Sequence, residues 1–102
     1  MGKHEAAAAL AEMAELMELA GENTFRARAY RAAARALEEY PGELESPADA
    51  AAIASLPGIG AALAAKITAF LADGTIPELE DLRRLVLLGS ERMAAARASD
   101  RI

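Results

Sequence analysis

The segment Leu56–Ile67, LPGIGAALAAKI, predicts a tight turn followed by a helix. Gly58 and Gly60 lie two positions apart behind Pro57, so the backbone can turn sharply with no side chain over its N–H groups. The N-terminus of the following helix adds a partial positive charge. These features predict a phosphate site on the backbone of Gly58, Ile59 and Gly60. An ordinary turn between two helices is the alternative that this stretch leaves open.

The rest of the chain predicts an all-α fold, a compact bundle of five to six short helices that contains this helix-hairpin-helix motif. Strand signals are missing, and helix start and stop signals are frequent. Ser46-Pro47-Ala48-Asp49 is a strong helix start, with a capping serine, a proline at the first helical position and an acid at the third. The helices are expected from about His4 to Ala20, from the cap Asn23 or Thr24 to Pro41, from Ser46 to the hairpin, from Ala61 to Asp73, from Pro77 to Gly89, and from Ser90 on.

Helical periodicity predicts which faces are buried. In the second helix the expected apolar face comprises Phe25, Ala29, Ala33, Ala36, Leu37 and Tyr40, with Tyr30 at its margin and Arg28, Arg31 and Arg35 opposite. In the fourth helix it comprises Leu63, Ile67, Phe70 and Leu71. Lys66 lies at the margin of the apolar face of the fourth helix, beside alanines.

The composition limits the classes of protein. The 102 residues carry a net charge of −5 and no cysteine, which excludes disulfides and thiolate metal sites. We expect one domain over 1–102, with a core over about 5–86 and a C-terminal extension over 87–102. No apolar run approaches the roughly 20 residues that span a bilayer, so we expect a soluble, cytoplasmic monomer without membrane contact. Acidic charge argues against nucleic acid as a partner unless a local basic face overrides it.

Two long segments resemble the N-terminal domain of X-family DNA polymerases (polymerase beta-like proteins). They are LAEMAELMELAGENTFRARAYRAAARALEEYP, Leu10–Pro41, and LPGIGAALAAKITAFLADGTIPELEDLR, Leu56–Arg83. The likeness extends over about Glu5 to Arg84. It implies a helix-hairpin-helix domain that binds gapped or nicked DNA near a 5′ end.

The resemblance also implies chemistry, because animal members of the family are 5′-deoxyribose-phosphate and abasic-site lyases. Lys66 matches the lysine that forms a Schiff base with the opened sugar, and Tyr30 matches a tyrosine of the lyase pocket. Arg26 and Arg31 would offer charge near the 5′ phosphate. No cofactor is required, but the family hairpin holds a monovalent cation (Na⁺ or K⁺) through backbone carbonyls, here those of Ala54, Leu56 and Ile59.

The sequence departs from the family pattern in its basic residues. Alanine stands at position 62 and glutamate at position 78 where animal enzymes have basic residues, and Phe25 and Arg26 replace a histidine and a lysine. A Schiff-base lysine must lose its proton before it attacks. The half-buried position expected for Lys66 favours the neutral amine. A solvated lysine at the edge of the core is the alternative.

A second hypothesis places the chain in another class of protein. Alanine supplies about half of the 54 % hydrophobic residues, and several basic positions of the family have become alanine. An engineered or de novo designed helical scaffold on this fold would show the same pattern. Such a scaffold would bind a small molecule or a protein and have no DNA-repair activity. Salt-sensitive DNA binding separates the two hypotheses.

Overall fold

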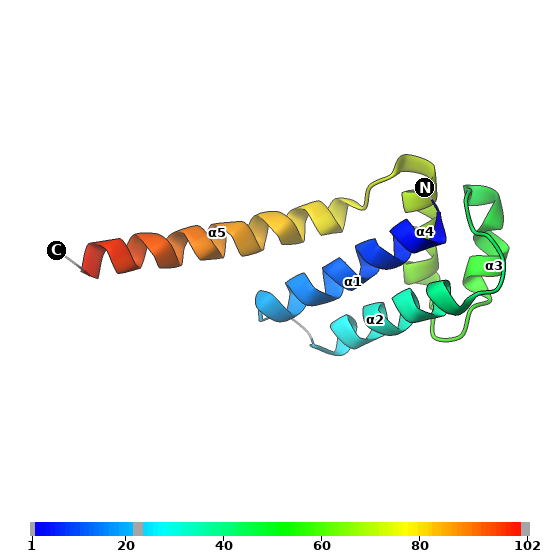
Figure 1. Ribbon diagram of the computed structural model, residues 1–102, viewed down its shortest axis with the longest axis horizontal. Helices are drawn as coiled ribbons and strands as arrows, with labels where there is room; N and C mark the ends of the chain where they lie inside the picture. The colour runs from blue at the N-terminus through cyan, green and yellow to red at the C-terminus, as the bar shows by residue number, and fades with distance from the viewer. Residues whose placement is uncertain (1, 22–23, 101–102) are drawn as a thin grey trace.

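The computed structural model describes residues 2–21 and 24–100, with side chains for 2–21, 24–46 and 48–88. All regular elements within these ranges are helices, which turns and loops connect. The elements are α1 (Lys3–Leu19), α2 (Thr24–Glu39), a 3₁₀ turn (Pro47–Asp49), α3 (Ala50–Ala54), α4 (Ala61–Asp73) and α5 (Pro77–Asp100). Helices α1 and α2 lie side by side, α4 crosses them, and α5 extends beyond the bundle (Figure 1). The predicted all-α fold is confirmed.

Most helix ends follow local signals in the sequence. Gly21 and Gly74 take left-handed φ angles of 72° and 76° at the ends of α1 and α4, where residues with a side chain would be strained. The hydroxyl of Ser46 accepts the amide of Ala48 at 3.3 Å, and Asp49 accepts the amide of Ser46 at 3.3 Å, as the predicted helix start requires. The alternative cap Asn23 lies outside the described residues, and Thr24 is already helical.

The end of the chain differs from the prediction. The sequence predicts that Gly89 closes one helix and that Ser90 begins another, but α5 continues through both to Asp100. A glycine inside a helix costs about 1 kcal/mol relative to alanine, and this cost alone does not stop a helix that good helix formers flank. No described helix is long and apolar enough to cross a membrane.

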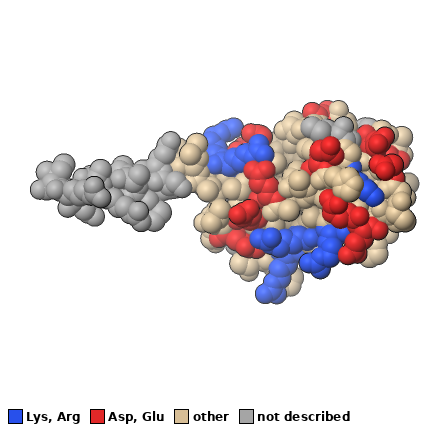
Figure 2. Space-filling model, in the orientation of Figure 1, with Lys and Arg blue, Asp and Glu red and all other residues tan. Residues whose placement is uncertain are grey.

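Helix α2 is rotated relative to the predicted face. The sequence predicts Phe25 and Ala29 on the buried side, but Phe25 is 80 % exposed and Ala29 is exposed as well. The buried residues are Ala27, Tyr30, Ala33, Ala34 and Leu37. The alanines of α2 occur on several of its faces, so the spacing of apolar residues alone does not define the face that contacts the core. The exposed face carries Arg28, Arg31 and Arg35, and Figure 2 shows Lys and Arg side chains gathered along the lower edge of the molecule, over α2.

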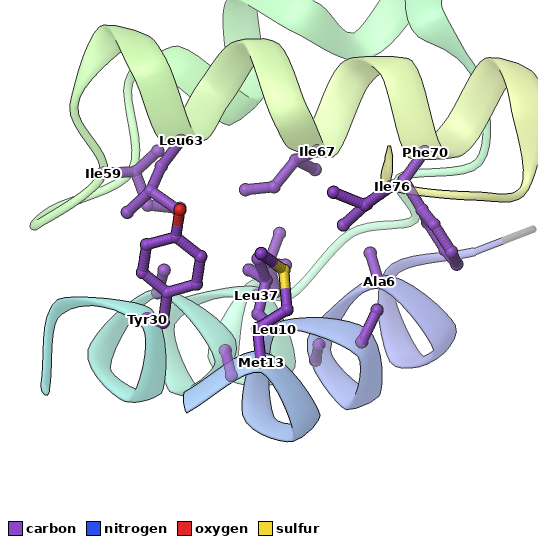
Figure 3. Close-up of a cluster of buried hydrophobic side chains, with 14 of the residues drawn as sticks. Ala6, Leu10, Met13, Tyr30, Leu37, Ile59, Leu63, Ile67, Phe70 and Ile76 are labelled. Atoms are coloured by element: carbon purple, nitrogen blue, oxygen red, sulfur yellow. The ribbon is translucent and has the colours of Figure 1, made fainter. Parts of the chain in front are cut away.

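The core lies between α4 and the α1–α2 pair (Figure 3). The largest side chains with almost no exposure are Leu10, Met13, Met17, Leu37, Leu44, Ile53 and Ile67. The predicted face of α4 is confirmed, because Leu63, Ile67, Phe70 and Leu71 are all buried. The Tyr30 ring stands between α2 and α4 with its hydroxyl directed at α4.

Overpacking of the α1–α2 contact tests this arrangement. Ala33 is 0 % exposed, so Ala33→Leu is expected to lower the free energy of unfolding by about 1–3 kcal/mol. The matched variant Ala29→Leu places the same side chain on the exposed face of α2 and is expected to change it by less than about 0.5 kcal/mol. Urea unfolding followed by circular dichroism measures both. Equal destabilisation by the two variants would contradict the observed rotation of α2.

Candidate functional site

The hairpin turn, Leu56–Gly60, connects α3 to α4. The amide of Ile59 donates to the carbonyl of Leu56 at 3.2 Å, and Gly58 has a φ of 81°. Pro57 in second place and a glycine with positive φ in third place are typical of a type II β-turn. Leu56 and Ile59 are buried, so they fix the turn to the core. The Ile59 amide is therefore engaged inside the turn, and the phosphate contacts expected of Gly58, Ile59 and Gly60 stay predictions.

The N-terminus of α4 follows the hairpin turn at Gly60. Gly60 precedes α4 in an extended conformation (φ −82°, ψ 174°), and no side chain caps the helix within the described part of the chain. The amides of Gly60, Ala61 and Ala62 have no acceptor inside the helix. All three residues are exposed, and a Cβ placed on Gly60 would meet no atom within 4 Å. These three amides, here named the α4 amide site, belong to exposed residues at the positive end of the helix dipole.

A groove connects the hairpin turn to the arginine face of α2. It has a volume of about 370 Å³. Its lining includes Arg35, Glu39, Tyr40 and Pro41 from α2 and the residues after it, and Leu56 and Pro57 from the hairpin turn. Arg35 makes no ion pair with another described residue, so its guanidinium is available to an anion bound beside the turn.

A second group of candidate functional side chains lies between α2, α4 and α5. The ammonium of Lys66 donates to the Tyr30 hydroxyl at 2.6 Å and to the Glu78 carboxylate at 2.7 Å. Arg26 donates to the same carboxylate at 3.0 Å and to the Tyr30 hydroxyl at 3.0 Å. The Tyr30 hydroxyl in turn donates to Glu78 at 3.2 Å. These four residues are named the Lys66 cluster below.

The ion pairs in the Lys66 cluster favour the protonated form of Lys66, whereas the sequence analysis expects a neutral amine. Burial by itself lowers the pKa of Lys66, but its hydrogen bonds to Glu78 and Tyr30 outweigh burial and hold the pKa above its ordinary value. Burial likewise raises the pKa of Glu78, and hydrogen bonds from Lys66 and Arg26 outweigh it and lower that pKa. Lys66 is therefore an ion-paired ammonium at neutral pH, and the expectation of a neutral amine is wrong.

The structure brings together three of the predicted lyase residues and separates a fourth. Lys66, Tyr30 and Arg26 meet in the cluster, whereas Arg31 pairs with Glu18 of α1 at 3.1 Å. The sequence did not identify Glu78 as their common partner. The sequence did contain a signal for this contact. Glutamate stands at position 78, where the family that the chain resembles has a basic residue, and a carboxylate near the expected lysine and arginine can pair with them.

Metal binding by side chains has no basis in the described residues. They include no group of three or more His, Asp or Glu residues placed to hold an ion. The cation expected at the hairpin would use only backbone carbonyls. The carbonyl of Leu56 accepts the Ile59 amide and keeps one lone pair for an ion. That cation site stays a prediction.

The comparison with known proteins agrees with the geometry of the hairpin. A family model described as a helix-hairpin-helix domain matches residues 1–76. The chain belongs to the helix-hairpin-helix domain family. The helix-hairpin-helix match contains the hairpin turn, the α4 amide site and Lys66, and it ends before Glu78.

The pH dependence of stability tests the ion pairs in this helix-hairpin-helix protein. Because the pKa of Glu78 is lowered on folding, its contribution is complete above the ordinary glutamate pKa of about 4.3 and is lost as the pH falls through the lowered value. Glu78→Gln is expected to cost about 1 kcal/mol of unfolding free energy at neutral pH. The difference from the unmodified chain should shrink as the pH falls from about 5 towards 2.

Urea unfolding at neutral and acidic pH measures this difference. Glu80→Gln is the matched control, because Glu80 lies two positions along α5 and pairs with Arg83 at the surface. It is expected to change stability by less than about 0.5 kcal/mol. A Glu78→Gln deficit that persists undiminished in acid would contradict the ion-pair assignment.

Proposed function

We propose that the chain binds the sugar-phosphate backbone of DNA, without sequence specificity, through the α4 amide site. The observation that carries the proposal is the uncapped, open N-terminus of α4 behind the hairpin turn. Amides at a helix N-terminus bind phosphate by direct hydrogen bonds, and the helix dipole favours the negative charge. Such contacts position a protein on the phosphate backbone and do not distinguish bases.

The distribution of charge supports the same surface. The chain as a whole carries a net charge of −5, which disfavours general adsorption to DNA. The arginine face of α2, however, is continuous with the hairpin groove through Arg35. In this proposal Arg35 contacts a further phosphate of the same strand. Binding is expected to be weak and to fall steeply with added salt.

Gly60→Asp separates phosphate binding from folding. Gly60 has an extended backbone that any residue can adopt, and an aspartate there would cap α4 with its own carboxylate. The variant is expected to unfold with unchanged or slightly higher free energy, and to bind DNA at least about tenfold more weakly, because the carboxylate occupies the amides and repels phosphate. Fluorescence anisotropy with two duplexes of unrelated sequence, at low and moderate salt, measures the binding.

The control carries the same change of charge at a distance. Ala8→Asp adds one negative charge on α1, beside Gly74 and Thr75 at the far end of α4. It is expected to leave DNA binding nearly unchanged. Equal affinities for Gly60→Asp and the unmodified chain would overturn the proposal, and absent binding by the unmodified chain would favour the scaffold hypothesis.

A second candidate function is lyase chemistry on gapped or nicked DNA, supported by the meeting of Lys66, Tyr30 and Arg26. In this chemistry the neutral Lys66 amine adds to the C1′ aldehyde of an opened sugar, water leaves, and an imine forms. A base then removes a C2′ proton. That electron pair forms a C=C bond as the C3′–O bond breaks, and the 3′ phosphate leaves with the electrons of the broken bond. Tyr30 would line the pocket, and Arg26 would face the 5′ phosphate.

Borohydride trapping tests the lyase candidate. A gapped duplex with a 5′-deoxyribose phosphate is mixed with the chain, and borohydride reduces any imine to a stable amine. The expected result is a covalent adduct that Lys66→Ala abolishes. The yield should be low at neutral pH because the ammonium is ion-paired. If neither the unmodified chain nor Glu78→Gln forms an adduct, Lys66 has no lyase function.

A further inference from the structure

Glu78 is the point on which the Lys66 cluster converges. Its carboxylate accepts hydrogen bonds from an ammonium, a guanidinium and a hydroxyl, with distances of 2.7, 3.0 and 3.2 Å. The side chains of Lys66 and Glu78 are 30 % and 32 % exposed. The Lys66 side chain is therefore only partly covered by other atoms, and its ammonium is engaged in hydrogen bonds to Tyr30 and Glu78.

We propose that Glu78 is an inhibitory counterion, which suppresses the reaction of the Lys66 amine with aldehydes by holding it as an ion-paired ammonium. The inference deepens the second candidate function and rests on it for the identity of the natural aldehyde. It concerns the reactivity of the amine itself, so a probe without DNA can test it.

The location of Glu78 makes this contact persistent. It is the second residue of α5, where the helix dipole favours a carboxylate. Ile76, two positions before Glu78, and Leu79, directly after it, are buried at 3 % and 4 % exposure, so the first turn of α5 is fixed to the core. A carboxylate held in this way does not leave Lys66 through motion of a loose loop.

The charged and titratable groups that face the Lys66 amine are few. Among the described residues they are the Tyr30 hydroxyl from α2 and the Glu78 carboxylate from α5, and the Arg26 guanidinium donates to both of these groups. Removing the charge of Glu78 while keeping its shape leaves Lys66 near a cation and a hydroxyl. Both the loss of the anion and the nearby guanidinium then favour the neutral amine.

Reductive methylation with formaldehyde and a borohydride reagent measures this reactivity. The neutral amine adds to formaldehyde, water leaves to give an imine, and hydride from the reagent reduces the imine to a methylamine. The chain has two lysines, Lys3 and Lys66, so mass spectrometry of peptides separates them. Lys3 is buried and donates to the carbonyls of Tyr40 and Gly42, and it serves as the internal reference.

The expected result is specific to Lys66. Below its pKa, the neutral fraction of an amine rises tenfold for each unit by which the pKa falls. Glu78→Gln is therefore expected to raise the initial methylation rate of Lys66 by about 3- to 10-fold near pH 8, and to lower the pH of half-maximal rate. The rate at Lys3 should stay unchanged. Glu80→Gln is the matched control and should leave both lysines as they are in the unmodified chain.

The conservative variant Glu78→Asp keeps the charge and should restore most of the suppression. An unchanged Lys66 rate in Glu78→Gln would overturn the proposal, as would an equal rise at Lys3, which would indicate general opening of the fold. A rise in Glu78→Asp as large as in Glu78→Gln would also overturn it, because the effect would then follow side-chain shape and not charge. None of these outcomes bears on DNA binding by the hairpin, which the Gly60→Asp comparison tests separately.

Discussion

The close contact between α1 and α2 is the constraint on which the rest of the fold depends. Small residues form much of it, with Ala14, Ala27 and Ala33 fully buried, so the two helices approach closely and few large side chains remain for the core. Lys3 secures one end of the pair, where its ammonium donates to the carbonyls of Tyr40 and Gly42 just beyond the C-terminus of α2. A cation at that position is favoured by the dipole of α2. The pair forms the surface on which α4 rests.

The way α4 rests on that surface leaves its N-terminus uncapped behind the hairpin turn. Buried Leu56 and Ile59 hold the turn from both sides, and Pro57, Gly58 and Gly60 between and after them are exposed. Because these apolar contacts and the hydrogen bond from Ile59 to Leu56 position the turn, the amides of Gly60, Ala61 and Ala62 are not used to hold it. A helix N-terminus that is fixed but uncapped is a donor site whose geometry is set before any anion arrives.

Features encoded by adjacent residues were predictable, and features that join distant segments were not. The cap at Ser46 and the helix ends at Gly21 and Gly74 depend on local geometry, and the sequence predicts each of them. The rotation of α2 about its axis depends on which of its alanines contact α1. Because alanines occur on several faces of α2, the pattern of apolar residues does not show which face is buried. The state of Lys66 depends on Glu78, twelve residues away and on another helix, so burial alone predicts the wrong direction for its pKa.

The two sites differ in how strongly they depend on the side chains of the chain. The α4 amide site is made of backbone N–H groups, which persist through any change of side chain that preserves the turn and leaves Gly60 small. The Lys66 cluster is made of side-chain charges, and one carboxylate there is enough to pair the lysine and the arginine. The proposed phosphate site therefore needs no basic side chain, whereas the amine of Lys66 is held in an ion pair by Glu78. DNA binding by the hairpin is the better-supported proposal, because it uses the backbone of the helix-hairpin-helix motif that the family match contains. Lyase chemistry is the weaker proposal, because it requires Lys66 to be released from its ion pair with Glu78.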